Sequence, residues 1–381
     1  MNRAITLVAI SAVLFIAGCK SQPAPVSSPN PAPGPTAETA SAPVSSETST
    51  APADEKLTST EGPSCDGCVT VTPDNFARAE TDLYFGNIVK ESGLGKIGSI
   101  RTLTPIDKQT VVRMNRDTLY SSGVFDLSAG PVTITLPDAG KRFMSMQVID
   151  EDEYTPMVVY GKGVYTISKG RVGTRYAAVL VRTLVDAQSQ QDLDEVHKLQ
   201  DAIKVSQRTV GSFEVPKWDK ASQDKVRQAL IALGATVTTF SKGFGTKQQT
   251  DPVMHLIGAA AGWGGNPDRD AKYVNLKVPN NDGIHLYKVT VGKVPVDGFW
   301  SISVYDAKGY FEKNAYGAYS LNNITAQKNQ DGTVTVQFGG CDGTIPNCLP
   351  ITKGWNATLR LYRPRPQILN GTWKFPELQE M

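Results

Sequence analysis

Short runs in which apolar and polar residues alternate, separated by turn residues, occupy much of the chain. In the run 132–136 large aliphatic residues alternate with threonines, and the runs 144–148 and 177–181 repeat the pattern with less contrast. Segments rich in Gly, Pro and Asp lie between them, at 128–131, 137–140 and 161–163. A period of two places successive side chains on opposite faces of a strand. The pattern therefore predicts a β-sandwich over about 100–185.

A second set of alternating runs begins at about residue 273. Its members lie at 285–291, 300–304, 334–338 and 355–361, and a Gln-Asp-Gly turn precedes the third. This spacing predicts a second all-β unit, either a sandwich or a jelly roll. No internal repeat of fixed period is visible.

Helical periodicity marks two further segments. Asp74 to Gly93 predicts a helix that Asp74 caps and Gly93 ends. Residues 190–240 read as helical, with Asp192 and Glu195 as a capping pair. The small residues from Gly258 to Gly265 predict a loop.

The N-terminus has the pattern of a bacterial lipoprotein signal peptide. Arg3 supplies the positive charge, an apolar stretch follows, and Ala17 and Gly18 precede Cys19. Cleavage before Cys19 and acylation of its thiol and amine, typically with palmitate, would tether the protein to a membrane. In lipoproteins of Gram-negative bacteria, Asp directly after the lipidated cysteine favours retention in the inner membrane. This chain has Lys20 at that position, which predicts the outer membrane. The folded body would then lie in the periplasm or at the cell surface.

A segment that cannot fold by itself follows the anchor. Residues 20–63 are rich in Pro, Ser, Ala and Thr and contain no aromatic residue, so they cannot bury enough apolar surface to offset their ordering entropy. We expect a signal peptide at 1–18 and a lipidated tether at 19–70. The folded body then consists of an N-terminal β-sandwich with its leading helix at 71–187, a helical connector at 188–250 and a C-terminal jelly roll at 251–381.

Cysteine usage agrees with export. The chain has five cysteines, and lipidation of Cys19 leaves an even number in an oxidising compartment. Cys65 and Cys68 flank two residues, and Cys341 and Cys348 enclose a turn-rich loop. Local disulfides are favoured over a redox motif or a four-cysteine metal site, although sequence alone leaves the connectivity open.

Composition and motifs exclude several classes of protein. Lys plus Arg number 39 and Asp plus Glu number 37, so no basic excess points to nucleic acid. The three histidines, His197, His255 and His285, lie in no metal-binding motif, and no nucleophile elbow or phosphate-binding loop occurs. We therefore predict no metal and no cofactor.

Longer strings resemble two families. Asn115–Ser122, Val132–Pro137 and Arg142–Gln147 resemble domain-of-unknown-function family 1254. Asp297–Asp306 and Leu359–Pro366, followed by the string at 369–374, resemble family 1214. The resemblance implies an immunoglobulin-like N-terminal sandwich, a helical connection and a C-terminal jelly roll. Relatives suggest that the protein associates with itself. The resemblance does not imply an established activity. Many relatives have Trp-Leu-Pro where this chain has Cys348-Leu-Pro.

Candidate site residues are few. Asn115, Arg116, Asp117 and Tyr120 form the most unusual polar cluster, and a structural corner is the first interpretation. If the chain is an enzyme, the catalytic candidates are Arg116, Asp117, Tyr120 and His285. If it binds a ligand, the candidates are Asn115, Arg116, Trp300 and Tyr305. The carboxylate run at 150–153 is interpreted as a solvated turn rather than an acid–base pair or a Ca²⁺ site.

Two hypotheses for the function follow. The first is an envelope-anchored binding or structural module that takes a small molecule, a glycan or a protein partner at the cleft between the sandwiches. The alternative is a hydrolase of ester or glycosidic bonds. The absence of a recognised catalytic constellation favours the first.

Overall fold

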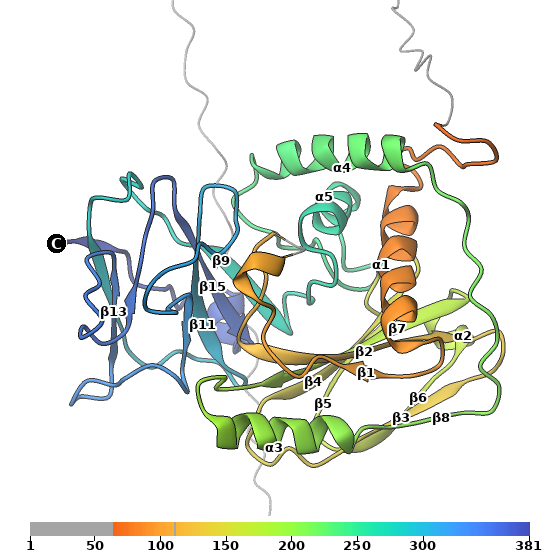
Figure 1. Ribbon diagram of the computed structural model, residues 1–381, viewed down its shortest axis with the longest axis horizontal. Coiled ribbons are helices and arrows are strands. Elements are labelled where there is room, and N and C mark those ends of the chain that lie inside the picture. Colours follow the sequence, from red (N-terminus) through yellow and green to blue (C-terminus); the bar gives the residue numbers. More distant parts are fainter. Residues whose placement is uncertain (1–63, 110–111) are drawn as a thin grey trace, which may run out of the picture. The chain divides into compact units, whose positions relative to one another are not determined.

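The computed structural model describes residues 64–109 and 112–381. The signal peptide, Cys19 and most of the predicted tether lie outside the described residues. Within them the protein is mainly β, with two β-rich units and several helices (Figure 1). The predicted fold class is therefore confirmed.

The N-terminal unit contains a five-stranded antiparallel sheet and a three-stranded sheet. The larger has the order β1 (Gly98–Ser99), β2 (Thr118–Asp126), β7 (Tyr176–Leu184), β4 (Met144–Asp150) and β5 (Met157–Tyr160). The smaller has the order β6 (Gly163–Ile167), β3 (Val132–Leu136) and β8 (Lys204–Gln207). Alternate residues of β3, such as Ile134, pack against alternate residues of β4 and β7, such as Met146 and Val179. The strands predicted at 132–136, 144–148 and 177–181 are confirmed, although burial alternates only along β3, because β4 and β7 are buried on both faces.

Helices cover part of the other face of the five-stranded sheet. Phe85 of α1 (Phe76–Ser92) packs on Val124 of β2 and Ala178 of β7. α4 (Lys220–Gly234) and α5 (Pro252–Gly262) pack against α1, and Figure 1 shows the three helices on one side of this sheet. The cap predicted for α1 is wrong by one residue, because Asn75 and not Asp74 precedes the helix.

The segment predicted as helical from 190 to 240 is only partly helical. α3 (Gln190–Asp201) and α4 are separated by extended chain that includes β8, and β8 pairs with β3. The predicted capping pair is also wrong, because the Ser189 side chain caps α3 and the Asp192 carboxylate binds Arg142. The loop predicted from Gly258 begins later, since α5 continues to Gly262.

The C-terminal unit consists of two four-stranded sheets. One contains β14 (Cys348–Leu349), β13 (Val334–Phe338), β10 (Tyr287–Val291) and β16 (Gln379–Glu380). The other contains β12 (Ser320–Asn322), β11 (Trp300–Tyr305), β15 (Asn356–Tyr362) and β9 (Ala271–Asn275). Val289, Ile302, Val336, Trp355 and Leu359 contribute to one core between the sheets. The prediction of a second all-β unit is confirmed.

Short elements complete the described chain. They are η1 (Ile106–Lys108), α2 (Lys169–Val172) and α6 (Pro366–Leu369). Cys65 pairs with Cys68 and Cys341 with Cys348, so the favoured local disulfides are confirmed and fit an exported protein. Among the described helices none is long and apolar enough to cross a bilayer.

Candidate functional site

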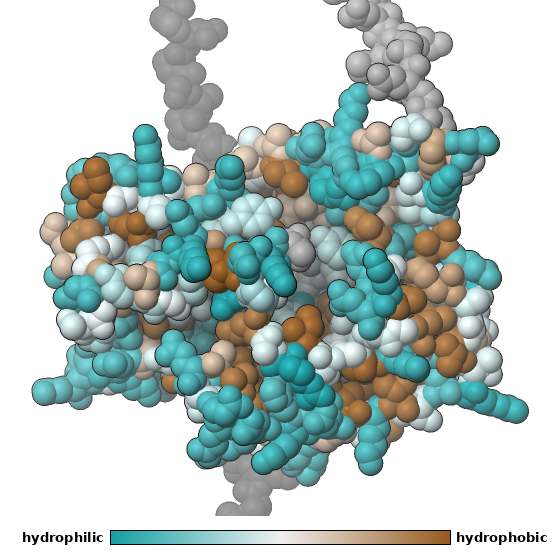
Figure 2. Space-filling model, viewed as in Figure 1, coloured by the Kyte–Doolittle hydropathy of each residue, from teal (hydrophilic) through white to brown (hydrophobic). Residues whose placement is uncertain are grey.

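A cavity of about 310 Å³, here called the central cavity, lies where the N-terminal sheet, the helices and the C-terminal unit meet. Tyr84 of α1, Tyr120 of β2 and Arg182 of β7 face it from the N-terminal side. Tyr273 of β9 and Arg360 of β15 face it from the C-terminal unit. Figure 2 shows the surface hollowed between that unit and the helices. The location is that of a cleft between two β units, a common setting for ligand sites.

Four arginines line the central cavity, and their charge is not matched by lining carboxylates. They are Arg113, Arg182, Arg227 and Arg360. Among the described residues that line the cavity there is no Asp, Glu, His, Lys, Ser or Cys. Arg227 is neutralised nearby, since its Nη2 lies 2.5 Å from Glu80 Oε2. The other three make no ion pair within the described part of the chain.

Arg182 stands in the middle of the five-stranded sheet and is 5% exposed. Its Nη1 donates to Gln147 Oε1 at 2.6 Å, and its Nη2 donates to the Gly264 carbonyl at 2.6 Å. The guanidinium lies 5.4 Å from the centre of the Tyr120 ring. Burial opposes the charged form, but the surrounding tyrosine oxygens outweigh it and raise the pKa of Arg182. A buried cation is therefore held by neutral acceptors.

Arg360 is the counterpart of Arg182 on the C-terminal side. Its Nη1 donates to Ser303 Oγ at 2.8 Å, and its Nη2 donates to Tyr305 Oη at 2.6 Å and to the Arg113 carbonyl at 2.7 Å. Burial opposes its charge, but Tyr305 and the nearby Asp117 raise its pKa. The Arg113 carbonyl is held at the cavity wall by this contact. The buried Nε of Arg113 has no acceptor among the described residues.

The loop after α5 forms one wall of the cavity. Gly264 has φ +79°, which favours glycine, and its N–H donates to Glu153 Oε1 at 3.1 Å. Trp263 stacks on Tyr84 with ring centres 4.3 Å apart and donates from Nε1 to Thr81 Oγ1 at 3.1 Å. Burial raises the pKa of Glu153 well above its ordinary value, which favours the neutral form of this carboxyl.

Two members of the cluster at 115–120 line the central cavity and two do not. Asn115 and Tyr120 face it, and Asn115 Nδ2 donates to Tyr362 Oη at 3.0 Å. Arg116 instead donates to the Thr104 carbonyl and lies over an aromatic ring. Asp117 is 1% exposed and accepts a hydrogen bond from the C-terminal unit. Asn115 and Tyr120 therefore belong to the wall of the cavity, whereas Asp117 lies at the contact between the N-terminal and C-terminal units.

The remaining candidates lie elsewhere. His285 precedes β10 and its Nδ1 lies 2.7 Å from Asp282 Oδ2, outside the lining of the central cavity. Trp300 belongs to the C-terminal core, and Tyr305 lies behind Arg360 with its hydroxyl on the Met114 carbonyl. The four catalytic candidates therefore do not meet in one cavity.

The carboxylate run at 150–153 is not the solvated turn predicted for it. Asp150, Glu151 and Glu153 are buried because α1 and the loop after α5 cover this turn. Arg78 Nη2 of α1 lies 2.7 Å from Asp152 Oδ1, and Arg78 Nη1 lies 3.7 Å from Glu151 Oε1. Among the described residues these carboxylates do not form a cluster that could hold a metal ion. The cluster with suitable spacing consists of Asp219, Cys65 and Cys68, and both cysteines are in a disulfide.

Sequence reasoning missed the most informative residues of the site. Arg182 interrupts the apolar strand 176–184, and Arg360 lies between Leu359 and Leu361 in a buried strand. A charged residue inside an otherwise buried strand is rare, because an unpaired buried charge is costly. That signal was visible in the sequence and points to both arginines.

Comparisons with known proteins agree with this architecture. A structure of the VPA0106 protein from Vibrio parahaemolyticus aligns with TM-score 0.58 and 17% identity, covering 81% of this chain and 97% of that one. This likeness shows the fold alone. An uncharacterized protein from Burkholderia cenocepacia aligns with TM-score 0.47 and 13% identity, covering 81% of this chain and 87% of that one. No curated protein sequence matches.

Family models match both β-rich units. Residues 95–207 match "Protein of unknown function (DUF1254)", and residues 274–366 match "Protein of unknown function (DUF1214)". The order is the one that the resemblance predicted. The chain therefore belongs to the proteins that carry a DUF1254 domain followed by a DUF1214 domain.

Proposed function

We propose that this protein is a cell-envelope binding module that takes a small organic anion into the central cavity. Arg182 is the observation that carries the proposal. It is a buried guanidinium that lines the cavity, and its hydrogen-bond acceptors are an amide oxygen and a carbonyl. A buried charge without a counter-ion is costly, and an anionic ligand would supply one.

The other lining residues fit the same class of ligand. The buried Nε of Arg113 lacks an acceptor among the described residues. The backbone carbonyl of the same residue accepts a hydrogen bond from Arg360. Guanidinium groups bind carboxylates and phosphates through paired N–H donors. Tyr84, Tyr120 and Trp263 add flat faces against which a ring or an apolar body can pack.

The same lining argues against a hydrolase of esters or glycosides. Such an enzyme needs a nucleophile or a pair of carboxyl groups beside the bond that breaks. The described cavity lining provides arginines, tyrosines, amides, apolar groups and the hydroxyl of Thr358, and no histidine or carboxyl group that could activate that hydroxyl. Binding without hydrolysis is the function that these residues support best.

The location completes the proposal. The disulfides fit an oxidising compartment, and the sequence before the folded body has the lipoprotein pattern ending in Cys19. We propose that the body is held on the outer membrane by acyl chains on Cys19. Labelled palmitate should enter the wild-type protein and not a Cys19→Ser variant. Equal labelling of both would contradict the anchor and leave the binding proposal unaffected.

The binding proposal is tested by screening the mature protein for thermal stabilisation with organic anions and their uncharged amides. We expect carboxylates or phosphates to raise the melting temperature and the amides to have no effect. Arg182→Met should lose at least tenfold in affinity, measured by calorimetry, because a charge-assisted contact disappears. Arg171→Met, at an exposed arginine of α2, is the matched control.

Folding of Arg182→Met is checked by its unfolding transition. If that variant does not fold, Arg113→Met tests the same prediction from a loop outside the sheet. No stabilisation by any organic anion, or unchanged affinity in a folded variant, would overturn the proposed function.

A further inference from the structure

A second hollow, here called the sheet groove, continues from the central cavity. Its volume is about 940 Å³, and eight residues line both spaces, among them Tyr84, Tyr120, Arg182 and Trp263. The groove runs between α1 and the segment 100–104, and β2 and β7 contribute to its lining. A ligand held at Arg182 therefore has room to extend along the sheet.

The part of the sheet that lines this groove is polar. Thr118, Tyr120 and Ser122 alternate along β2 and so share one face, which lines the groove. Across the β2–β7 pairing, Tyr120 is opposite Arg182 and Ser122 is opposite Leu180. Tyr120, Ser122 and the Arg182 guanidinium therefore lie along this face beside Leu180, whereas Thr118 is buried and its hydroxyl accepts a hydrogen bond from Asn115 Nδ2.

The covered part of the same face is apolar. Val124, two residues beyond Ser122, and Ala178, two residues before Leu180, pack under Phe85 of α1. The helix therefore covers the apolar end of the face and leaves the hydroxyl-bearing end as the floor of the groove. Packing alone does not require polar residues on a sheet face. Their placement leaves the hydroxyl groups of Tyr120 and Ser122 at the groove, where a ligand can reach them.

The walls of the groove carry neutral hydrogen-bonding groups beside the apolar side chains of Leu83, Ile88, Ile100 and Leu103. Asn87 projects from α1, and Thr102 and Thr104 lie on the opposite side. The charged residues Glu80, Lys90 and Glu91 of α1 also line the groove, and Glu80 is paired with Arg227. Hydroxyls and amides beside aromatic faces suit the hydroxyl groups and the apolar face of a sugar ring. An acyl chain would leave these polar groups without partners, which costs binding energy.

We infer that the anion bound by this protein is an acidic oligosaccharide. Its carboxylate-bearing sugar occupies the central cavity beside Arg182, and neutral sugars continue into the sheet groove over Tyr120 and Ser122. This inference rests on the proposed function, because it uses the same arginine for the acid group. It adds the chemical class of the ligand and the direction in which the ligand extends.

The test measures affinity by calorimetry for sugars of increasing length that end in one uronic acid. The mature protein is titrated with the free uronic acid, with a disaccharide and a trisaccharide whose other units are neutral, and with a linear alkyl carboxylate. Each neutral sugar should improve affinity at least threefold, because it adds hydrogen bonds in the groove. Replacing the uronic acid by the neutral sugar should abolish binding.

Variants of the groove separate the two proposals. Ser122→Ala and Asn87→Ala should each weaken trisaccharide binding by about threefold to tenfold and leave the free uronic acid unaffected. Thr133→Ala, which removes an exposed hydroxyl from β3 outside the groove, is the matched control.

The outcomes are distinct. If affinity does not rise with sugar length, or if only the alkyl carboxylate binds, the inference fails and the proposed function stands. If no acid of any kind binds, the proposed function fails as well. Length-dependent binding that both groove variants weaken supports the inference.

Discussion

Asp117 Oδ1 accepts a hydrogen bond from Asn322 Nδ2 at 3.1 Å, and both residues are buried. The contact joins the residue before β2 to the last residue of β12, so it links the N-terminal unit to the C-terminal unit. Asp117 is also one of the groups that hold the Arg360 charge in place. A buried carboxyl is thus one of the groups that join the two units beside the central cavity.

Removing this carboxyl should destabilise the whole folded body. Asp117→Ala leaves Asn322 Nδ2 without its acceptor and removes a carboxyl group that favours the charged form of Arg360, and we expect a loss of about 3 kcal/mol in the free energy of unfolding. Urea unfolding measures it. Asp331→Ala, at an exposed turn, should change stability by no more than about 0.5 kcal/mol. A loss as small as that of the control would contradict the role of Asp117.

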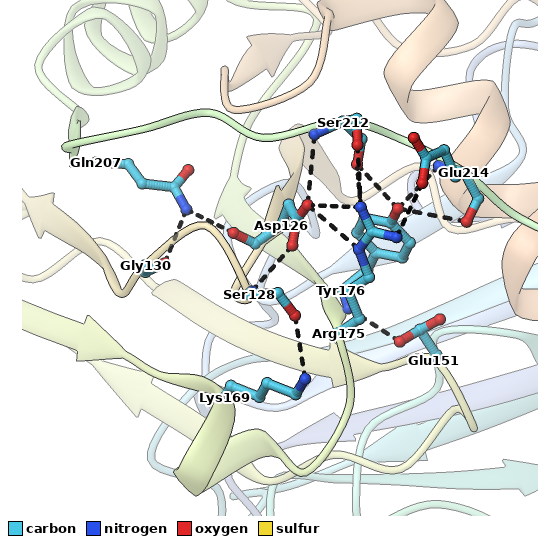
Figure 3. A network of polar contacts seen from close by, with 10 residues as sticks. All are labelled: Asp126, Ser128, Gly130, Glu151, Lys169, Arg175, Tyr176, Gln207, Ser212 and Glu214. Carbon is cyan, nitrogen blue, oxygen red and sulfur yellow. Dashed lines mark hydrogen bonds and ion pairs between the residues drawn. The ribbon is translucent and has the colours of Figure 1, made fainter.

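The extended chain between β8 and α4 is attached to the five-stranded sheet by a polar network (Figure 3). Arg175 Nη2 lies 3.1 Å from Asp126 Oδ2, and the Tyr176 hydroxyl donates to the Ser212 carbonyl at 2.9 Å. The Asp126 side chain is 3% exposed, whereas that of Glu214, the other acidic partner of Arg175, is 69% exposed. Burial should make the first pair much the stronger.

We therefore expect Asp126→Ala and Glu214→Ala to differ in effect. Asp126→Ala should lower the free energy of unfolding by about 2 kcal/mol, and Glu214→Ala by at most about 0.5 kcal/mol. Hydrogen exchange of the backbone amides in 208–215 should rise mainly in the first variant. Equal exchange in the two variants would show that the network does not hold this segment.

Local patterns predicted the strands well where burial is one-sided. β3 alternates apolar and polar residues, and its buried positions are the apolar ones. Short β8 escaped recognition because its partner, β3, lies about seventy residues earlier, and four residues carry little periodic signal. Helix ends were misplaced by one or a few residues for a different reason, because neighbouring polar residues such as Asp74 and Asn75 are similar candidates for the cap.

The site was harder to predict because its members come together only through the fold. Arg182 binds Gln147 and Gly264, which are 35 and 82 residues away in sequence. No spacing rule connects such residues. The cluster at 115–120 drew attention as a polar string, yet its strand pairing decides that Tyr120 faces the cavity. The sequence marked Asn115 and Tyr120 as candidates, and only the tertiary structure placed Arg182 and Arg360 beside them.

Glu153 should behave as a neutral carboxylic acid that holds the wall of the cavity. Glu153→Gln keeps an oxygen for the Gly264 N–H, so its stability at pH 7 should equal that of the wild type or exceed it. Glu153→Ala should lose about 2–3 kcal/mol, because it leaves the Gly264 N–H without an acceptor and opens a void. Urea unfolding of both variants checks this. A glutamine variant as unstable as the alanine variant would mean that the charged form is needed.

Asp150 should make the wild type less stable as the pH rises. Burial raises its pKa from 3.8 to about 7, while two backbone N–H groups, those of Asp152 and Tyr154, donate to Oδ1. Between these values the folded protein keeps a proton that the unfolded chain releases, so the free energy of unfolding falls with increasing pH in that window. Above about pH 7 the full cost of the buried charge is present.

Asp150→Asn removes this cost and keeps the accepting oxygen. At pH 8 the variant should be more stable than the wild type by about 2–4 kcal/mol, and the difference should shrink toward pH 4. Urea unfolding at several pH values in buffers without carboxylate or phosphate measures it and avoids ligand binding in the central cavity. Asp331→Asn, at an exposed turn where hydrogen bonds from Thr333 lower the aspartate pKa, should gain no stability at pH 8. A constant difference at all pH values would show that Asp150 does not titrate in this window, and a less stable variant at pH 8 would show that its charge is needed.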